Sequence, residues 1–460
     1  MSPHPIVRWA TTSTRLLVGG AVAAATVVAV GVGVAFAWPS ATVRPVAVTA
    51  TPPPADTLLA CDGPLLALGR DVEQAGALSV AADQSVVSGP ADVGATAGTL
   101  AGPTDVAPAT FSAAPSGSSP AAFAAAGSSA VESADLRGAA ASACRQPLLE
   151  SWLVGGSTVT GTNDLLVLSN PGTVAATVQL TTYGASGAQV APGASDRVVP
   201  AGRQVIVPLA GLLPTEQSPV VRVTSTGAPV TASLQSSLVR VLTAVGVDRV
   251  SPLAAPATRL VIPGVTVASA DASQGATTIV RALSADVDTV VRISVRGADG
   301  QDVQAPASLP LSAGRPAELE LTGLPTGVYT VTVEADAPVV AGAWSTTTGT
   351  AGSDFAWYAA APAIDVPTRV AVAPGAGAQL VVTGFDTDAT VSITAPSGVV
   401  QELSVPAGGA AAVPVGEPGV YEVAPQGAIA AAVAYAADGA LASYPVWGAD
   451  AAAPPLVVYP

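Results

Sequence analysis

The chain has one histidine, His4, beside 32 acidic residues, two cysteines and no lysine. Triad-type serine and cysteine hydrolases use a histidine as general base, and many zinc sites use histidine as a ligand. His4 precedes the uncharged apolar run of residues 16–37, which separates it from the rest of the chain. We therefore expect a protein that is not an enzyme, with no catalytic residue, no cofactor and no metal ligand.

Paired carboxylates are the remaining residues that could do chemistry. Asp286 with Asp288 and Asp386 with Asp388 each form an Asp-x-Asp pair. Acids at this spacing can bind calcium, and two converging carboxylates can hydrolyse a glycoside. Both pairs occupy the position that residues 170–172, Asn-Pro-Gly, fill in another repeat, and aspartate is common in turns because its side chain bonds nearby backbone. We interpret the pairs as turn residues, with calcium binding and hydrolysis as alternatives.

Aromatic side chains could form a ligand platform, because sugar-binding modules stack rings on sugars. Only 4% of the residues are aromatic, and several lie late in two repeats, at Phe355, Trp357, Tyr444 and Trp447. In a chain so poor in rings, a tryptophan commonly fills the space between two sheets. Core packing is the preferred interpretation, and a platform at Trp357 and Trp447 is the alternative.

The two cysteines, Cys61 and Cys144, both follow the apolar run. In an oxidising compartment an isolated pair most simply forms one disulfide. The bridge would close a loop long enough to stabilise the fold by about 4–5 kcal/mol through loop-closure entropy. Two unrelated free thiols are the alternative.

The formal net charge of the chain is −15 at pH 7. Phosphate backbones bind clustered lysine and arginine, so this balance excludes a nucleic-acid partner. It also disfavours electrostatic binding to anionic lipid. The excess of acid is typical of a solubility surface, with a cation-binding surface as the alternative.

Residues 16–37 contain no charged side chain. The length of this segment is close to the roughly 20 apolar residues that a helix needs to cross a bilayer. Arg8 and Arg15 precede this segment without any acid, so residues 1–15 are predicted to be cytoplasmic and the bulk extracytoplasmic. The segment is predicted to be a single-pass membrane helix. The alternative is a signal peptide cleaved after Ala37 and a secreted protein, because Ala-Phe-Ala precedes Trp38.

The residues between the apolar segment and residue 144 fall into three parts that differ in composition. Residues 38–57 are rich in proline and predict a spacer. Residues 58–80 are apolar enough to add strands to the first folded module. Residues 81–143 are rich in Ala, Ser, Gly and Pro, a composition that buries little surface, and we expect a disordered loop whose ends the disulfide joins.

From residue 144 onward the chain repeats itself, with a Pro/Ser-Ala-Gly turn ending at Gly202, Gly314 and Gly408. Apolar and polar residues alternate between frequent turns, which is typical of antiparallel strands. The sequence predicts an all-β fold of tandem immunoglobulin or fibronectin-like antiparallel β-sandwiches after one N-terminal transmembrane helix. The three predicted sandwiches are residues 144–256, residues 257–367 and residues 368–460.

The order of short motifs resembles a known family. WLVGG at residues 152–156, LVLSNPG at 166–172, VPAGRQVIVPL at 199–209 and APVTASL at 228–234 follow the apolar segment and an Ala/Ser-rich stretch. This order resembles an actinobacterial exported or membrane-anchored family known as domain of unknown function 5719. The resemblance implies a role in envelope assembly beside a membrane glycosyltransferase, and it carries over no functional residue.

These observations predict a non-catalytic, membrane-anchored extracytoplasmic protein that scaffolds or binds in the cell envelope. Its expected partners are the membrane, through the N-terminal helix, and an envelope glycan or a membrane glycosyltransferase. A carbohydrate-binding module protein and a carboxylate-based glycan hydrolase are the two alternatives.

Overall fold

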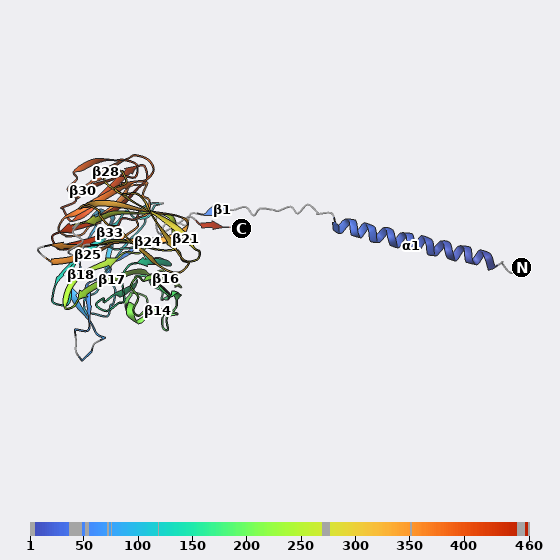
Figure 1. The fold of residues 1–460 in the computed structure, drawn as a ribbon, viewed down its shortest axis with the longest axis horizontal. Coiled ribbons are helices and arrows are strands. Elements are labelled where there is room, and N and C mark those ends of the chain that lie inside the picture. Colours follow the sequence, from blue (N-terminus) through green and yellow to red (C-terminus); the bar gives the residue numbers. More distant parts are fainter. Residues whose placement is uncertain are drawn as a thin grey trace. The chain divides into compact units, whose positions relative to one another are not determined.

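The computed structural model describes residues 5–35, 48–50, 55–70, 73–74, 76–117, 119–268, 277–349, 352–448 and 456–458. It divides into two units, one comprising Met1–Pro52 with Pro455–Pro460 and the other Pro53–Pro454. The first unit holds the helix and the second holds most of the strands (Figure 1).

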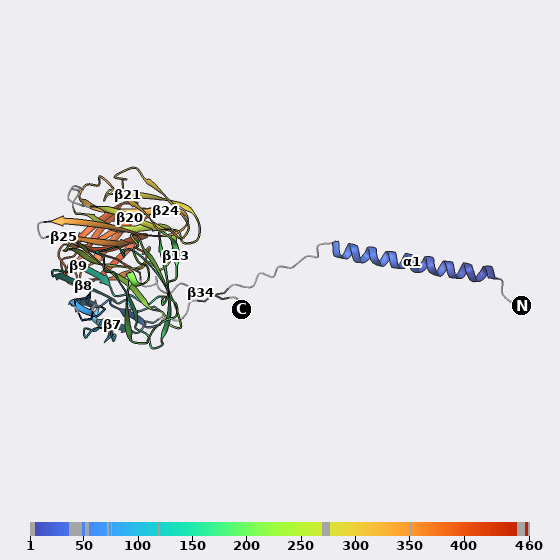
Figure 2. The same ribbon diagram turned by 60° about the horizontal axis from the view of Figure 1, so that its bottom comes forward.

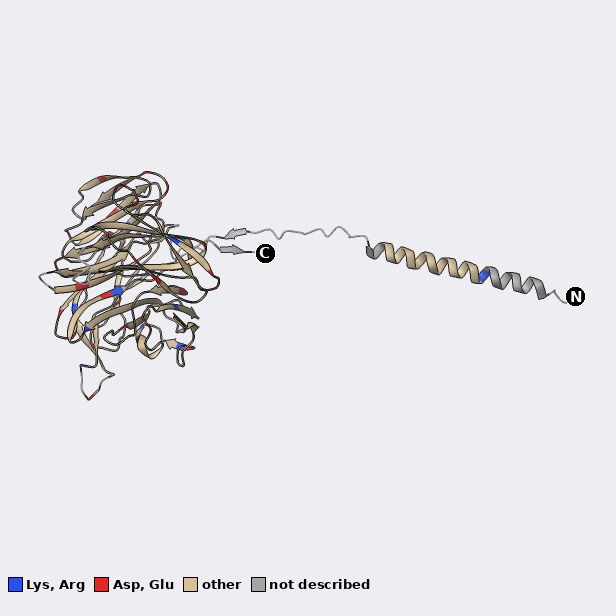
Figure 3. Cartoon of the chain, in the orientation of Figure 1, with Lys and Arg blue, Asp and Glu red and all other residues tan. Residues whose placement is uncertain are grey.

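The first unit contains the helix α1 (Pro5–Ala35) and a pair of short antiparallel strands, β1 (Val48–Ala50) and β34 (Leu456–Val458). Within α1, Arg15–Val32 has a mean hydropathy of 2.0 and is long and apolar enough to cross a membrane. The described part of the helix is nearly free of charge (Figure 3). An anchor and a signal sequence both fit this helix; Ala37 and most of the predicted spacer lie outside the described residues.

The second unit is built from antiparallel strands, as the apolar-polar alternation predicts. We define module B by its nine strands, which form the sheets β10-β16-β12-β13, with β14 also on β12, and β15-β11-β17-β18. A single turn of 3-10 helix, η2 (Leu209–Gly211), follows β15. The strands are β10 (Glu150–Val154), β11 (Leu165–Asn170), β12 (Ala176–Gly184), β13 (Gly187–Gln189), β14 (Arg197–Val199), β15 (Arg203–Pro208), β16 (Val220–Thr226), β17 (Thr231–Arg240) and β18 (Thr243–Val250).

Module D repeats this order at the end of the chain. Its sheets are β26-β31-β28-β29 and β30-β27-β32-β33. When the short strand β14 of module B is left out of the count, one sheet in both modules joins the first, sixth, third and fourth strands, and the other joins the fifth, second, seventh and eighth. The strands are β26 (Thr368–Val372), β27 (Ala378–Gly384), β28 (Ala389–Thr394), β29 (Val400–Val405), β30 (Ala410–Pro414), β31 (Gly419–Gln426), β32 (Ile429–Ala437) and β33 (Ala440–Pro445).

Module C has the same order with its sixth and seventh strands fused into one. The first part of β24 pairs with β19 and β21, and its second part pairs with β20 and β25. One long strand therefore belongs to both sheets. The strands are β19 (Ala257–Val267), β20 (Thr278–Leu283), β21 (Thr289–Arg296), β22 (Ala307–Leu311), β23 (Ala317–Glu320), β24 (Gly327–Gly349) and β25 (Gly352–Ala359).

The prediction of a disordered loop over residues 81–143 is wrong, because this stretch folds into most of a fourth module, module A. Its sheets β2-β7-β6 and β5-β8-β9 match the first-sixth-third and second-seventh-eighth strands of the other modules. A hairpin of β3 and β4 is added, and the turn η1 (Ala91–Val93) follows β5. The strands are β2 (Thr57–Ala60), β3 (Leu65–Leu68), β4 (Leu78–Ala82), β5 (Ser85–Gly89), β6 (Thr96–Thr99), β7 (Ala109–Ala113), β8 (Ala124–Glu132) and β9 (Arg137–Ala143).

Several small side chains of module A are buried against neighbouring modules. Ala126 and Ala141 belong to the apolar cluster of module D. Ala140 packs in another cluster with Leu65 and with Val247 of module B. The composition that suggested disorder is therefore compatible with a thin layer between larger modules.

The last strands of the four modules meet in a closed circuit. Strand β9 contacts β18 and β33, and β25 contacts the same two strands. Modules A, B, C and D thus follow one another around a ring in which D returns to A. Figure 2 shows β9 and β25, from modules A and C, in the same part of this unit.

Large side chains cross the boundary between modules B and C. Trp152 and Tyr183 of module B belong to the apolar cluster of module C. Phe355 and Trp357 of module C belong to that of module B. Burying each such side chain contributes about 1.5–3 kcal/mol, so this boundary is packed like a domain interior.

Candidate functional site

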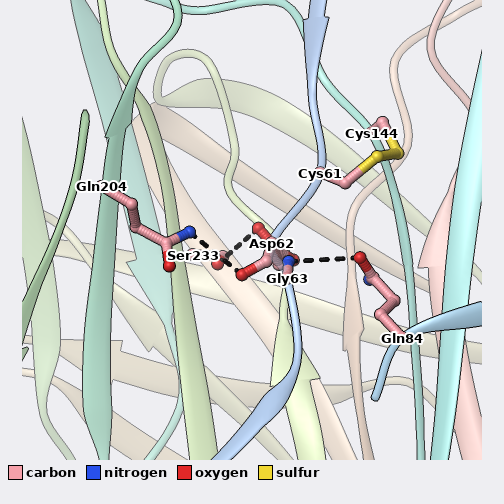
Figure 4. Close-up of a disulfide and its surroundings, with 7 residues drawn as sticks. All are labelled: Cys61, Asp62, Gly63, Gln84, Cys144, Gln204 and Ser233. Carbon is pink, nitrogen blue, oxygen red and sulfur yellow. Dashed lines mark hydrogen bonds between the residues drawn. A yellow bond between two sulfur atoms is a disulfide. The ribbon is translucent and has the colours of Figure 1, made fainter. Parts of the chain in front are cut away.

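The predicted disulfide is present and joins Cys61, at the end of β2, to Cys144, just after β9. The loop beside it is tied to module B (Figure 4). Gln204 Nε2 donates to the Asp62 carbonyl at 3.1 Å, and Ser233 Oγ donates to Asp62 Oδ1 at 2.7 Å. The bridge therefore joins the two ends of module A, and the hydrogen bonds hold Asp62, beside one of these ends, against module B.

Trp357 is buried, with 6% of its surface exposed, and it does not form a ligand platform. The Arg281 guanidinium lies 4.8 Å from the centre of its ring. Arg281 donates to the carbonyls of Gly156 and Pro219 and forms an ion pair with Glu318 at 2.8 Å. Trp357 and Arg281 thus join modules B and C, because β25 packs its aromatic side chains toward its neighbour.

Trp447, just after β33, lines a cavity of about 110 Å³ between modules A and D. Trp447 is one of the two tryptophans that the sequence analysis named as an alternative ligand platform. Arg145, one residue beyond the disulfide, lines the same cavity. Small or apolar side chains form much of the wall, among them Leu59, Ala121, Phe123, Ala124 and Val446.

The Arg145 guanidinium lies over the Trp447 ring at 4.9 Å from its centre. Arg145 Nη2 and Trp447 Nε1 are both shielded from solvent, and neither has a hydrogen-bond partner among the described residues. Burial lowers the pKa of Arg145 to about 10, against the charges of Asp62 and Tyr444, which raise it. Arg145 therefore stays positively charged at neutral pH, and two residues of the cavity lining carry N–H donors that have no partner among the described residues.

A family model described as a family of unknown function, DUF5719, matches residues 79–416. The chain belongs to the DUF5719 family. This family match includes Cys144 and Arg145 and ends before Trp447. It confirms the family to which the motif order pointed.

Comparisons with curated proteins and with solved structures add no known activity to the DUF5719 match. No curated protein matches the chain. A solved structure titled "Biofilm associated protein - BSP domain" is 11% identical, with a TM-score of 0.13. That match covers 71% of this chain and 63% of the other, so this chain spans less than two thirds of its length.

The Asp-x-Asp pairs of this DUF5719 chain make turn contacts. Asp288 Oδ1 accepts from Ala313 N at 2.8 Å, and Asp388 Oδ1 accepts from Ala407 N at 2.9 Å, at equivalent turns of modules C and D. Among the residues searched, no group of three or more His, Cys, Asp or Glu side chains could hold a metal ion. These contacts favour the turn interpretation of the pairs.

Sequence reasoning missed Asp354 of β25, which lies where the four closing strands meet. Its carboxylate accepts hydrogen bonds from the backbone of three other modules: Ala139 N at 2.9 Å, Val247 N at 3.3 Å and Leu441 N at 3.1 Å. The side chain is fully buried, and burial raises its pKa to about 8 although these N–H groups lower it. No local sequence signal marks this residue, because its partners come from distant parts of the chain.

Proposed function

We propose that this DUF5719 chain is a non-catalytic, membrane-anchored binding protein that scaffolds components of the cell envelope. The observation that carries the proposal is the cavity lined by Arg145 and Trp447, whose N–H donors include two without a partner among the described residues. Its described lining contains no Asp, Glu or His, and Cys144 is in the disulfide, so neither general base nor thiol nucleophile stands beside the donors. Such a cavity suits recognition rather than turnover.

The proposed topology places α1 in the membrane, the N-terminus in the cytoplasm and the ring outside. The apolar span of α1, Arg8 and Arg15 before it, and the disulfide support this arrangement. Cleavage after Ala37 would instead release the same ring as a secreted protein. We also propose that each module is immunoglobulin or fibronectin-like, which the paired antiparallel sheets support.

The experiment is cross-linking in intact cells followed by purification of the full chain from membranes. We expect co-purification of an envelope glycan or a membrane glycosyltransferase, and less of it with R145Q. The matched control is R222Q, because Arg222 lies over Trp152 in the same manner but in module B. Turnover of an envelope substrate by the purified chain would refute a non-catalytic role.

Carbohydrate binding is the second candidate function, and a larger cavity favours it. Trp447 also lines a space of about 360 Å³ between modules C and D, together with Phe385 and Arg259. Two aromatic rings and a guanidinium at one cavity are groups that sugars stack against and bond. Under this alternative F385A weakens glycan binding, whereas R145Q does not.

A further inference from the structure

The described residues contain four arginines that lie over aromatic rings, and a carboxylate of the chain bonds three of them. The pairs are Arg222 over Trp152, Arg281 over Trp357, Arg259 over Phe385 and Arg145 over Trp447. The three carboxylates belong to Glu150, Glu318 and Asp386. Arg145 is the one of the four for which the described chain supplies no such group.

The pair in module B shows how this arrangement holds a carboxylate. Arg222 lies 5.2 Å from the centre of the Trp152 ring. Glu150 Oε1 accepts from Trp152 Nε1 at 2.7 Å and from Arg222 Nε at 3.1 Å, and Glu150 Oε2 accepts from Arg222 Nη2 at 3.1 Å. One carboxylate thus satisfies the indole N–H and two guanidinium N–H groups.

Arg145 and Trp447 line a cavity and carry the same kinds of donor. The distance from guanidinium to ring is 4.9 Å, close to that of the module B pair. The shielded Nη2 and Nε1 correspond to two of the three donors that Glu150 satisfies in module B. Shielded donors without a partner are costly, and a charge-assisted carboxylate contact would remove that cost.

Among the described residues, the acids beside the two cavity arginines are engaged elsewhere. Asp62 contributes charge to Arg145, but its Oδ1 accepts from Ser233 Oγ and it forms no ion pair with Arg145. Arg369, which also lines the cavity, is already paired with Glu422 at 2.8 Å. Within the part of the chain that the structure describes, Arg145 is therefore the cavity arginine without an ion pair.

We propose that this cavity binds the terminal carboxylate of a peptide that ends in a small apolar residue. The inference rests on the proposed binding function and names the chemical class of the ligand. The carboxylate takes the position relative to Arg145 and Trp447 that Glu150 takes relative to Arg222 and Trp152. The small substituent packs against the alanine-rich wall.

The lining of the cavity suits a small apolar group beside the carboxylate. The cavity volume of about 110 Å³ leaves room for a carboxylate and a methyl group. Ala121, Ala124 and Val446 form an apolar part of the wall against which a methyl group can pack. A sugar acid is the alternative ligand, and the test below includes one as a probe.

The test is a titration of the full chain in detergent with small probes, followed by saturation-transfer NMR. The probes are N-acetylalanine, its amide, glucuronate and inorganic phosphate. We expect N-acetylalanine to bind about tenfold or more tightly than the amide, because the amide lacks the charge that the guanidinium recognises.

Three variants locate the binding. R145Q is expected to lose at least about tenfold in affinity for N-acetylalanine, and W447F, which keeps a ring but removes the indole N–H, about three- to tenfold. R145K keeps the charge without the planar fork and should also weaken binding, so the test stands even where R145Q folds poorly. R222Q is the control and should leave the affinity unchanged.

Equal binding of acid and amide, or of phosphate and N-acetylalanine, would overturn the proposed carboxylate recognition. Tighter binding of glucuronate would show that the ligand is a sugar acid and not a peptide end. No binding of any probe would also refute the inference. If no probe binds but co-purification of partners from cells still falls with R145Q, the envelope-binding function stands and only the assignment of a peptide end as the ligand falls.

Discussion

Replacing Asp354 by alanine tests whether this one carboxylate holds the ring closed. The substitution removes the acceptor for Ala139 N, Val247 N and Leu441 N, one backbone group from each of the other modules. A buried donor left without an acceptor costs about 1–3 kcal/mol, so D354A should lower the free energy of unfolding by about 3–9 kcal/mol. In D354N one amide oxygen can retain the two bonds made by Oδ2, and the expected loss is about 1–3 kcal/mol.

The assay is urea denaturation of the full chain in detergent, followed by far-ultraviolet circular dichroism and tryptophan fluorescence. D336A is the matched control, because Asp336 is an exposed acid on the neighbouring strand β24 and should be nearly neutral. Loss of a common midpoint between the two signals in D354A would show that the modules now unfold separately. If D354A costs less than about 1 kcal/mol, the three bonds do not close the ring, and our reasoning is refuted.

Three further predictions follow from the described contacts. C144S should lower the free energy of unfolding by about 4–5 kcal/mol through loop-closure entropy, and the wild type in reductant should show the same loss of urea midpoint. R281M should cost about 3–5 kcal/mol because it leaves Glu318 and two carbonyl groups without their partner; a loss under about 1 kcal/mol in the same assay would contradict the buried pairing. Burial raises the pKa of Asp354 to about 8 and that of Asp164 to about 7, so between about pH 4 and these values the folded chain holds protons that the unfolded chain releases. Stability should therefore fall as pH rises from about 5 to about 8.5, less steeply in D354N, whereas a rise over this range would show that other groups dominate.

The strands of the larger modules could be predicted because one face of each is apolar. In β21, Val291, Ile293 and Val295 alternate with more polar residues, and all three are buried. This local pattern is sufficient to recognise a strand and to assign an all-β fold. The order of the strands in a sheet depends on pairing between distant segments, and the local alternation does not predict which strands pair.

Module A escaped prediction for a physical reason. Ala126 and Ala140 are buried although alanine carries little apolar surface. They pack with residues of modules D and B, so their burial depends on the assembled ring and not on the local sequence. The adjacent Val86 and Val87 in β5 are a local signal for a strand, but this signal is too short to outweigh the composition around it.

Sequence reasoning could identify some residues of the candidate site but not others. Trp447 stood out because tryptophan is rare in this chain, and Cys144 stood out as half of a cysteine pair. Arg145 is one of many arginines, and its significance lies in a ring contact with a residue near the other end of the chain. Comparison with Arg222 and Trp152 also required coordinates, because Arg222 lies on a different strand from Trp152 and Glu150.

The ring closes where module D returns to module A, and this junction has consequences for how such a chain can change over evolution. An open array of repeats gains or loses one repeat and keeps its remaining interfaces. In the closed circuit, an extra module would separate β9 from β33 and leave Asp354 without one of its partners. Descent by duplication would therefore preserve the number of modules while allowing one of them to shrink, as module A has by lacking its fourth and fifth strands. The same seam holds Arg145 and Trp447, so a duplication event that broke the ring would also remove the cavity.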